Sequence, residues 1–392
     1  MTLQSNISKL YIIKMAKWFM LTMPILMLYY KEHGFSDTEA FQLKAAYSLA
    51  IVLFEVPSGY IADVLGRKRT LVIGSILGTL GFFIYSITSG FMAFLIAEII
   101  LGIGQSFISG ADSALLYDTL KHTKREDDYV KYEGRTYTIG NYSEALAGLI
   151  GGVIATFSLH LPFVLQTVIA FAAVPAALSL IEPPTHSKRK NPGIADVFRV
   201  IKYATITNRT LRYNLLISSI LGTATLTMAW TYQLYLKDVG FENYAIGIVH
   251  ALLNIVVGTT TLFAYKIERR LAPKGTIWFT SVSITMVFLL LGFVQSAWAV
   301  AALVLFYVSR GIATPVFKYY VNNITPSDIR ATVLSVRSLV IRMLFAILAP
   351  LYGWLSDAYG RPAAMQSLGL TFTVLVGISI ALFFRAMKQR SD

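Results

Sequence analysis

The sequence predicts an all-α membrane protein with twelve transmembrane helices in two six-helix bundles. Of its 392 residues, 55% are hydrophobic and 14% are charged, whereas soluble domains carry roughly 25% charged residues. A single soluble core could not absorb that much apolar surface. Apolar segments of about 20 residues, long enough to cross a bilayer, recur along the whole chain. A polar segment rich in proline and charge divides them into six and six.

Each predicted span is a mostly apolar segment with polar or charged residues at its ends. The first set lies near residues 10–30, 41–61, 70–89, 91–118, 132–158 and 162–181. The second set lies near residues 211–236, 243–266, 276–295, 297–321, 332–356 and 363–385. We therefore expect an N-terminal bundle over residues 1–182 and a C-terminal bundle over residues 209–392. Between them, residues 183–208 form a cytoplasmic linker with a short amphipathic stretch at Ile194–Arg209.

The basic residues predict the orientation in the membrane. Placing both termini in the cytoplasm puts most of the 34 lysines and arginines at cytoplasmic helix ends. We therefore expect a multi-pass protein of the inner membrane, a monomer in contact with the lipid bilayer. The net charge of +13 is spread over short loops, not over a basic face with stacking aromatics, so no nucleic acid partner is expected.

One short stretch, residues 59–69, carries the pattern G-x-x-x-D-x-x-G-R-K-R between the second and third spans. It resembles the signature between helices 2 and 3 of the major facilitator superfamily of secondary transporters. The resemblance implies a gating loop in which Gly59 and Gly66 permit a tight turn. It also implies that Asp63 contacts the start of span 11 and that Arg67 joins an acid at the inner end of span 4, here Asp118.

Span 4 carries polar residues at intervals of seven, Glu98, Gln105 and Asp112, which would place them along one face of a continuous helix. Ionisable groups in the bilayer usually face a water-filled path or a partner. We interpret Glu98 and Asp112 as proton-coupling candidates and Gln105 as a substrate contact. The alternative is that both acids pair with neighbouring helices. Family members commonly carry arginine where this chain has Glu98, so the role of that arginine does not transfer.

Span 5 partly resembles a glycine pattern of drug–proton antiporters in the same superfamily, with glycine in place of its proline. Close helix packing is an equally good explanation of these small residues. Glu144 lies one turn from Asn141 near the middle of this span, so it either titrates or has a cationic partner. The matching positions are Gly134, Ser143, Ala147, Gly148, Gly151 and Gly152.

Candidate substrate contacts combine cations, amides and one tryptophan. Arginine suits the capture of carboxylate or phosphate, and Arg310 and Arg342 lie deep in spans 10 and 11. His250 and Asn254, one turn apart on span 8, could relay protons or form a structural pair. The full set of substrate candidates is Lys17, Gln105, Asn141, Trp230, Arg310 and Arg342.

These features together predict a secondary active transporter that moves a small organic molecule by alternating access. The span 5 pattern favours export coupled to protons, although another coupling cation stays open. The alternative is a proton-coupled importer of an organic acid, sugar or similar nutrient. A membrane-embedded enzyme fits less well, because the sequence has no clustered nucleophile and base. A passive channel fits less well, because it would not need two halves with a loop cluster at the gate. No nucleotide-binding loop or metal-ligand cluster occurs, so we expect neither cofactor nor metal and no enzymatic activity.

Overall fold

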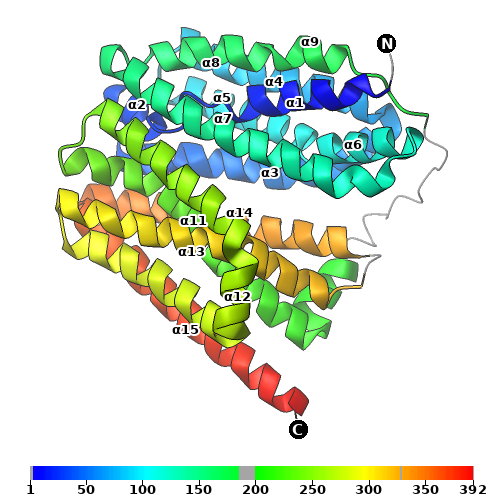
Figure 1. Ribbon diagram of the computed structural model, residues 1–392. Coiled ribbons are helices and arrows are strands. Elements are labelled where there is room, and N and C mark those ends of the chain that lie inside the picture. Colours follow the sequence, from blue (N-terminus) through cyan, green and yellow to red (C-terminus); the bar gives the residue numbers. More distant parts are fainter. Residues whose placement is uncertain (1–2, 185–198, 327–328, 392) are drawn as a thin grey trace. The chain divides into compact units, whose positions relative to one another are not determined.

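The structure is a computed structural model that describes residues 3–184, 199–326 and 329–391 (Figure 1). The described residues form helices and no strand. The chain divides into two compact units. Unit 1 comprises Met1–Asn191 with Glu242–Ile255, and unit 2 comprises Pro192–Phe241 with Val256–Asp392. The expected bounds at residues 182 and 209 stay a prediction, and the first five residues of the expected amphipathic stretch, Ile194–Arg209, lie outside the described residues.

Unit 1 is built around α5, which packs against α3 and α4, while α4 also packs against α8. A short 3₁₀ turn, Glu126–Asp128, precedes α7. The helices are α1 (Ser5–Trp18), α2 (Leu26–Glu32), α3 (Asp37–Leu65), α4 (Arg67–Ile87), α5 (Phe91–Ile108), α6 (Ala111–His122), α7 (Tyr129–Phe157), α8 (Leu161–Phe171) and α9 (Ala173–Leu178).

Unit 2 is built around α11, most of which is buried against α13, α14 and α15. The π-helical turn Tyr203–Thr207 precedes α11, and a 3₁₀ turn, Ala297–Val300, precedes α13. The helices are α11 (Arg209–Asp238), α13 (Ala301–Asn323), α14 (Arg330–Tyr359) and α15 (Arg361–Ser391). One helix, α12 (Asn243–Phe293), belongs to unit 1 over its first turns and to unit 2 from Val256 onward.

Nine helices of the described part are long and apolar enough to cross a membrane. One of them, α12, has 51 residues and a non-helical break at Ala272, directly before Pro273. The break lies between predicted spans 8 and 9, as expected of two crossings that follow each other with almost no loop between them. Large apolar side chains such as Leu53, Val168 and Ile347 are exposed, as lipid-facing residues should be. The total of twelve crossings stays a prediction.

Predicted span 1 is not a continuous helix. Helix α1 ends at Trp18 and α2 begins at Leu26, with Pro24 in between. Proline has no backbone N–H and interrupts a helix. In this non-helical segment the backbone N–H of Leu21 has no helical partner. It donates instead to Oε1 of the buried Gln166 at 2.8 Å.

Predicted span 4 is also broken, and this corrects the expectation for its acids. Helix α5 ends at Ile108 and α6 begins at Ala111, because Gly110 adopts a φ of +86°. That left-handed conformation favours glycine and ends a right-handed helix. Glu98 on α5 and Asp112 on α6 are therefore not on one continuous helical face, and the seven-residue interval does not bring them together.

The glycines of α7 allow unusually close contacts. A Cβ on Gly151 would lie 2.1 Å from the backbone oxygen of Leu21. A Cβ on Gly152 would lie 2.6 Å from the Cα of Gly247, and one on Gly148 would lie 2.5 Å from the His250 ring. These glycines are thus required where α7 meets the interrupted first span and the start of α12.

We expect Gly151→Ala to destabilise the protein by about 1–3 kcal/mol, the usual cost of overpacking a close contact. The backbone oxygen of Leu21 cannot move without disturbing the break between α1 and α2. Gly134→Ala on the same helix is the matched control, because nothing lies within 4 Å of its Cβ. Thermal unfolding in detergent compares the two variants. Equal unfolding midpoints would contradict the close contact at Gly151.

Candidate functional site

The signature at residues 59–69 is mostly helical, which corrects the expectation of a loop. Helix α3 continues to Leu65, and only Gly66, with a φ of +93°, separates it from α4. Gly59 lies inside α3 with nothing within 4 Å of its Cβ position. Its conformational freedom is therefore not used in a turn. The side chain of Asp63 lies outside the described part of the structure, so its expected contact with span 11 stays a prediction.

Arg67 and Asp118, which the sequence predicts to be neighbours, are in contact. Arg67 Nη1 donates to the Asp118 carboxylate on α6 and, at 2.6 Å, to the carbonyl oxygen of Ala114. Both charged side chains are 18% exposed. The charge-assisted hydrogen bond joins the start of α4 to α6.

Glu182 completes this cluster, and sequence reasoning missed it. Its carboxylate accepts from the backbone N–H groups of Arg67 at 2.9 Å and Lys68 at 2.6 Å. A carboxylate at a helix N-terminus satisfies orphan donors and complements the helix dipole. Glu182 follows α9, more than a hundred residues from α4. The sequence marks it only as part of a polar break, and no local spacing relates it to Arg67.

We expect Arg67→Ala to leave the protein inserted but to lower transport roughly tenfold, the factor that about 1.4 kcal/mol of lost stabilisation of one state produces. The reason is that Arg67 bridges α4 and α6, so its loss changes the balance between two helix arrangements. Arg69→Ala is the control, since Arg69 belongs to the same basic run and is exposed. Transport rates per folded protein, measured in proteoliposomes, decide the question. Equal rates in the two variants would remove the gating role.

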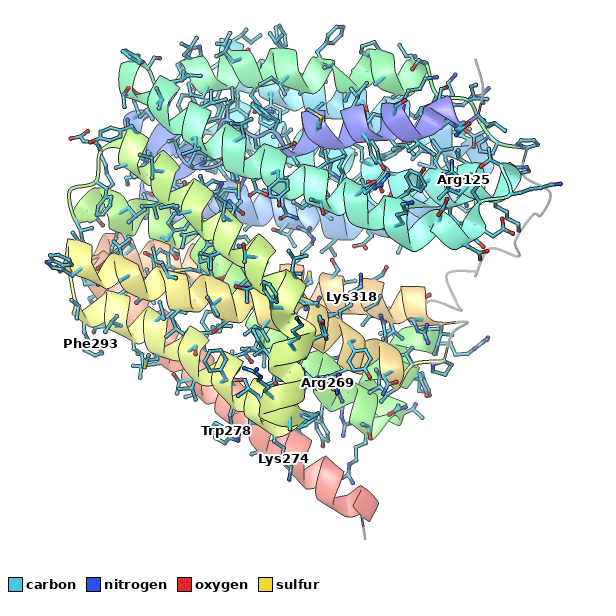
Figure 2. The ribbon with its side chains drawn as sticks, in the orientation of Figure 1. Arg125, Arg269, Lys274, Trp278, Phe293 and Lys318 are labelled. Carbon is cyan, nitrogen blue, oxygen red and sulfur yellow. The ribbon has the colours of Figure 1, made fainter. Side chains whose placement is uncertain are left out.

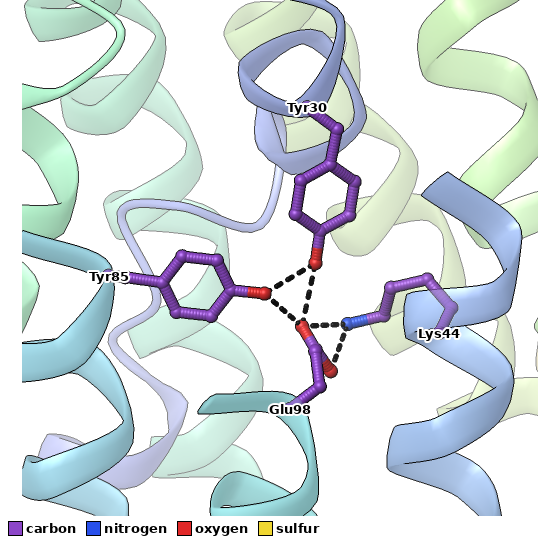
Figure 3. A network of polar contacts seen from close by, with 4 residues as sticks. All are labelled: Tyr30, Lys44, Tyr85 and Glu98. Carbon is purple, nitrogen blue, oxygen red and sulfur yellow. Dashed lines mark hydrogen bonds and ion pairs between the residues drawn. The ribbon is translucent and has the colours of Figure 1, made fainter. Parts of the chain in front are cut away.

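Glu98 lies at the centre of a buried polar network (Figure 3). Its side chain is 1% exposed, and Lys44 donates to both carboxylate oxygens at 2.9 and 3.0 Å. The hydroxyls of Tyr30 and Tyr85 donate to Oε1 at 2.8 and 2.7 Å. The four side chains come from α2, α3, α4 and α5, so each of these helices contributes one group.

The network gives Glu98 a fixed cationic partner within unit 1. Burying two charges is costly unless they are paired and hydrogen-bonded, and this pair meets both conditions. The sequence did not identify Lys44 as this partner, because the two residues are 54 positions apart on different helices. The geometry therefore favours the alternative that Glu98 is a helix-pairing residue.

Asp112 also has a cation nearby. Lys14 Nζ on α1 lies 3.5 Å from its carboxylate, and the two side chains are 15% and 16% exposed. Asp112 lies in the first turn of α6, where its Oδ1 accepts from Ser113 N at 2.8 Å. Unlike Glu98, it is partly accessible and its ion pair is loose. Of the site residues predicted from sequence, the structure thus brings Arg67 and Asp118 together and gives Glu98 and Asp112 other partners.

Glu144 on α7 faces His250 on α12. The distance between its carboxylate and His250 Nε2 is 3.8 Å, and the Glu144 side chain is 18% exposed. His250 is buried, and the amide nitrogen of Asn254 lies 3.0 Å from the same ring nitrogen. Glu144 and the Asn254 amide thus both face the same nitrogen of the imidazole ring.

The candidate substrate residues are distributed over both units. Lys17 lies in the last turn of α1, and Gln105 and Asn141 are half-buried on α5 and α7. In unit 2, Trp230 is buried in α11, and the guanidinium of Arg310 lies 5.4 Å from the centre of the Tyr307 ring. Arg342 is half-buried on α14.

The helical fold and the signature cluster define a secondary transporter of the major facilitator class. The profile described as Major Facilitator Superfamily matches residues 10–350. The chain belongs to this superfamily. Its nine candidate crossings within the described residues are in keeping with a multi-pass membrane protein.

Two sequence relatives are named for drug resistance. The quinolone resistance protein NorA of Staphylococcus aureus is 25% identical over 167 residues, which cover 43% of this chain and 42% of NorA. The match thus spans less than half of that protein. The class D tetracycline resistance protein of Salmonella ordonez is 24% identical over 285 residues, which cover 70% of this chain and 68% of that protein.

Solved structures of transporters share the fold. The nucleoside transporter NupG superposes with a TM-score of 0.78 at 16% identity, covering 99% of both chains. A bacterial homologue of the human lysosomal transporter Spinster also gives 0.78, at 15% identity, covering 98% of this chain and 97% of that one. At these identities the likeness concerns the fold alone.

Proposed function

We propose that this protein exports a small organic molecule across the inner membrane in exchange for protons, with Glu144 as the proton carrier. The observation that carries the proposal is the contact between Glu144 and His250. The two relatives named for quinolone and tetracycline resistance support export. Both termini are proposed to lie in the cytoplasm and the protein to act as a monomer.

The position of His250 explains how a proton on Glu144 could act on the transport cycle. Helix α12 belongs to unit 1 up to Ile255 and to unit 2 from Val256. A charge change at Glu144 would alter the electrostatic interaction between α7 and α12. A ligand or proton shifts a conformational equilibrium only by its differential affinity for the two states. We propose that Glu144, a partly exposed carboxylate facing a helix that continues into unit 2, binds a proton with different affinity in the two states.

Accessibility ranks the three proposed proton-coupling acids. Glu144 is 18% exposed, and its carboxylate lies 3.8 Å from His250 Nε2. Asp112, at 16% exposed, is held loosely by Lys14 and is the second candidate. Glu98, at 1% exposed with four hydrogen bonds, has the least freedom to exchange a proton.

The mixture of charges on the candidate residues supports a proposal for the substrate class. Lys17, Arg310 and Arg342 are cations, and Trp230 offers an aromatic surface. Gln105 and Asn141 add amide groups. We propose an amphiphilic, zwitterionic or anionic substrate, because guanidinium groups suit carboxylates and phosphates.

Transport by purified protein in proteoliposomes tests the proposal. A panel that includes a quinolone, a tetracycline, an organic acid and a sugar is offered with an imposed pH gradient. We expect one class of compound to accumulate on the more acidic side of the vesicle membrane, opposite to the direction of proton flow, and to lose this accumulation when a protonophore is added. Accumulation on the less acidic side, in the direction of proton flow, would indicate the alternative, proton-coupled import. Flux that ignores the gradient would contradict proton coupling.

A further inference from the structure

A basic pocket lies on α12 in unit 2, and none of its lining residues is among the candidate site residues. It has a volume of about 540 Å³ and is lined by Phe263, Lys266, Ile267, Arg269 and Arg270. Four of these residues follow the helical spacing i, i+3, i+4 and i+7, which places them on one face. The pocket therefore combines three cations and two apolar side chains, and its lining contains no acid.

The acid that lies within this basic run is engaged elsewhere. Glu268 Oε1 accepts from the hydroxyl of Tyr320 on α13 at 3.0 Å. In the described part of the chain, Lys266, Arg269 and Arg270 have no ion pair with an acid. Their positive charge is consequently available to an anionic ligand.

One lining residue of the pocket is held by packing between two helices. Ile267 packs against the buried cluster of Ala264, Ile312 and Val316, which joins α12 to α13. Thr261 Oγ1 also donates to the carbonyl oxygen of Gly311 at 3.1 Å. The contact between the two helices holds the pocket wall in place. The three cations of the lining are exposed.

The surroundings of the pocket indicate the membrane–water boundary. Leu262, Tyr265 and Trp278 are each more than half exposed and flank the basic residues. Tyrosine and tryptophan are enriched at this boundary. The helical break at Ala272 follows directly. Figure 2 shows Arg269, Lys274 and Trp278 along this part of α12.

We propose that this pocket binds the headgroup of an anionic phospholipid. Arginine and lysine contact the phosphodiester, and Phe263 and Ile267 contact the glycerol and the start of the acyl chains. Free phosphate would use the cations but not the apolar wall, and the exposed apolar residues beside the pocket would have no partner. The occupant is therefore a lipid that places phosphate and hydrocarbon side by side.

Native mass spectrometry of the full-length protein in detergent tests this proposal with phosphatidylglycerol and phosphatidylcholine as probes. We expect tighter binding of phosphatidylglycerol, weakened about fivefold for each arginine removed in Arg269→Gln and Arg270→Gln. The matched control is Lys121→Gln with Lys131→Gln, which removes two exposed charges from unit 1. Thermal unfolding without added lipid confirms that each variant is folded.

Each outcome decides the matter. Weaker phosphatidylglycerol binding in the arginine variants, with unchanged binding in the control, supports the pocket. Equal binding of the two lipids by the unaltered protein overturns the proposal, as does equal phosphatidylglycerol binding in the arginine variants and the control. If inorganic phosphate at millimolar concentration displaces phosphatidylglycerol, the pocket is an anion site and its assignment to lipid is wrong.

Discussion

Glu144→Gln is expected to abolish transport driven by a pH gradient while the protein stays folded and still exchanges substrate. Glutamine has the shape of glutamate but cannot carry a proton at this position. The carboxylate lies 3.8 Å from His250 Nε2, farther than a hydrogen bond, and the amide of glutamine keeps the same shape, so we expect the variant to stay folded. We expect gradient-driven flux to fall at least about a hundredfold, because the Glu144 carboxylate is the single proposed proton carrier and the variant lacks it.

The measurement compares gradient-driven flux with exchange of labelled for unlabelled substrate at equal pH. Glu133→Gln is the matched control, an acid on the same helix that accepts from Ser113 at 2.7 Å. Intact gradient-driven flux in Glu144→Gln would end the proton-carrier assignment. Loss of both activities together with a lower unfolding midpoint would show a structural pair with His250 instead.

Glu98→Gln is expected to reduce stability strongly. It removes the negative charge from the side chain whose two oxygens accept hydrogen bonds from the buried Lys44 ammonium. Removing one partner of a buried ion pair costs about 3–5 kcal/mol. Lys44→Met should be similarly harmful, and the double variant should be more stable than the sum of the single effects implies. Tyr85→Phe removes only one hydrogen bond to the carboxylate and should cost about 1.5–3 kcal/mol.

Thermal unfolding in detergent across these four variants provides the test. The double variant distinguishes an ion pair from two independent residues. Additive losses in Glu98→Gln and Lys44→Met would contradict the pairing as the source of stability. A fully stable Glu98→Gln that loses proton-driven flux would instead return Glu98 to the role of proton carrier.

The sequence predicted the helices well because hydropathy and segment length report the bilayer directly. It could not locate the breaks inside two spans. An apolar segment with Pro24 or Gly110 satisfies the same hydropathy criterion whether it is straight or interrupted. The expectation that Glu98 and Asp112 share a face failed for this reason, since it assumed one helix from end to end.

The site was predictable where a family signature names both partners and not where a contact depends on tertiary packing. Arg67 and Asp118 are such a predicted pair. Glu182, which caps α4, and Lys44, which pairs with Glu98, lie far along the chain from their partners. Any acid can in principle cap a helix N-terminus or pair with a buried cation, so the sequence offers many candidates. Only the tertiary fold determines which acid lies beside which partner.

The proposed mechanism depends most on a proton moving through Glu144 in exchange for substrate. A pH-sensitive dye inside proteoliposomes measures this directly when the transported compound of the panel is added without an imposed gradient. The mechanism predicts proton movement opposite to the substrate in the unaltered protein and in Glu133→Gln, and none in Glu144→Gln. Substrate flux without proton movement in the unaltered protein, or equal proton movement in all three, would contradict it.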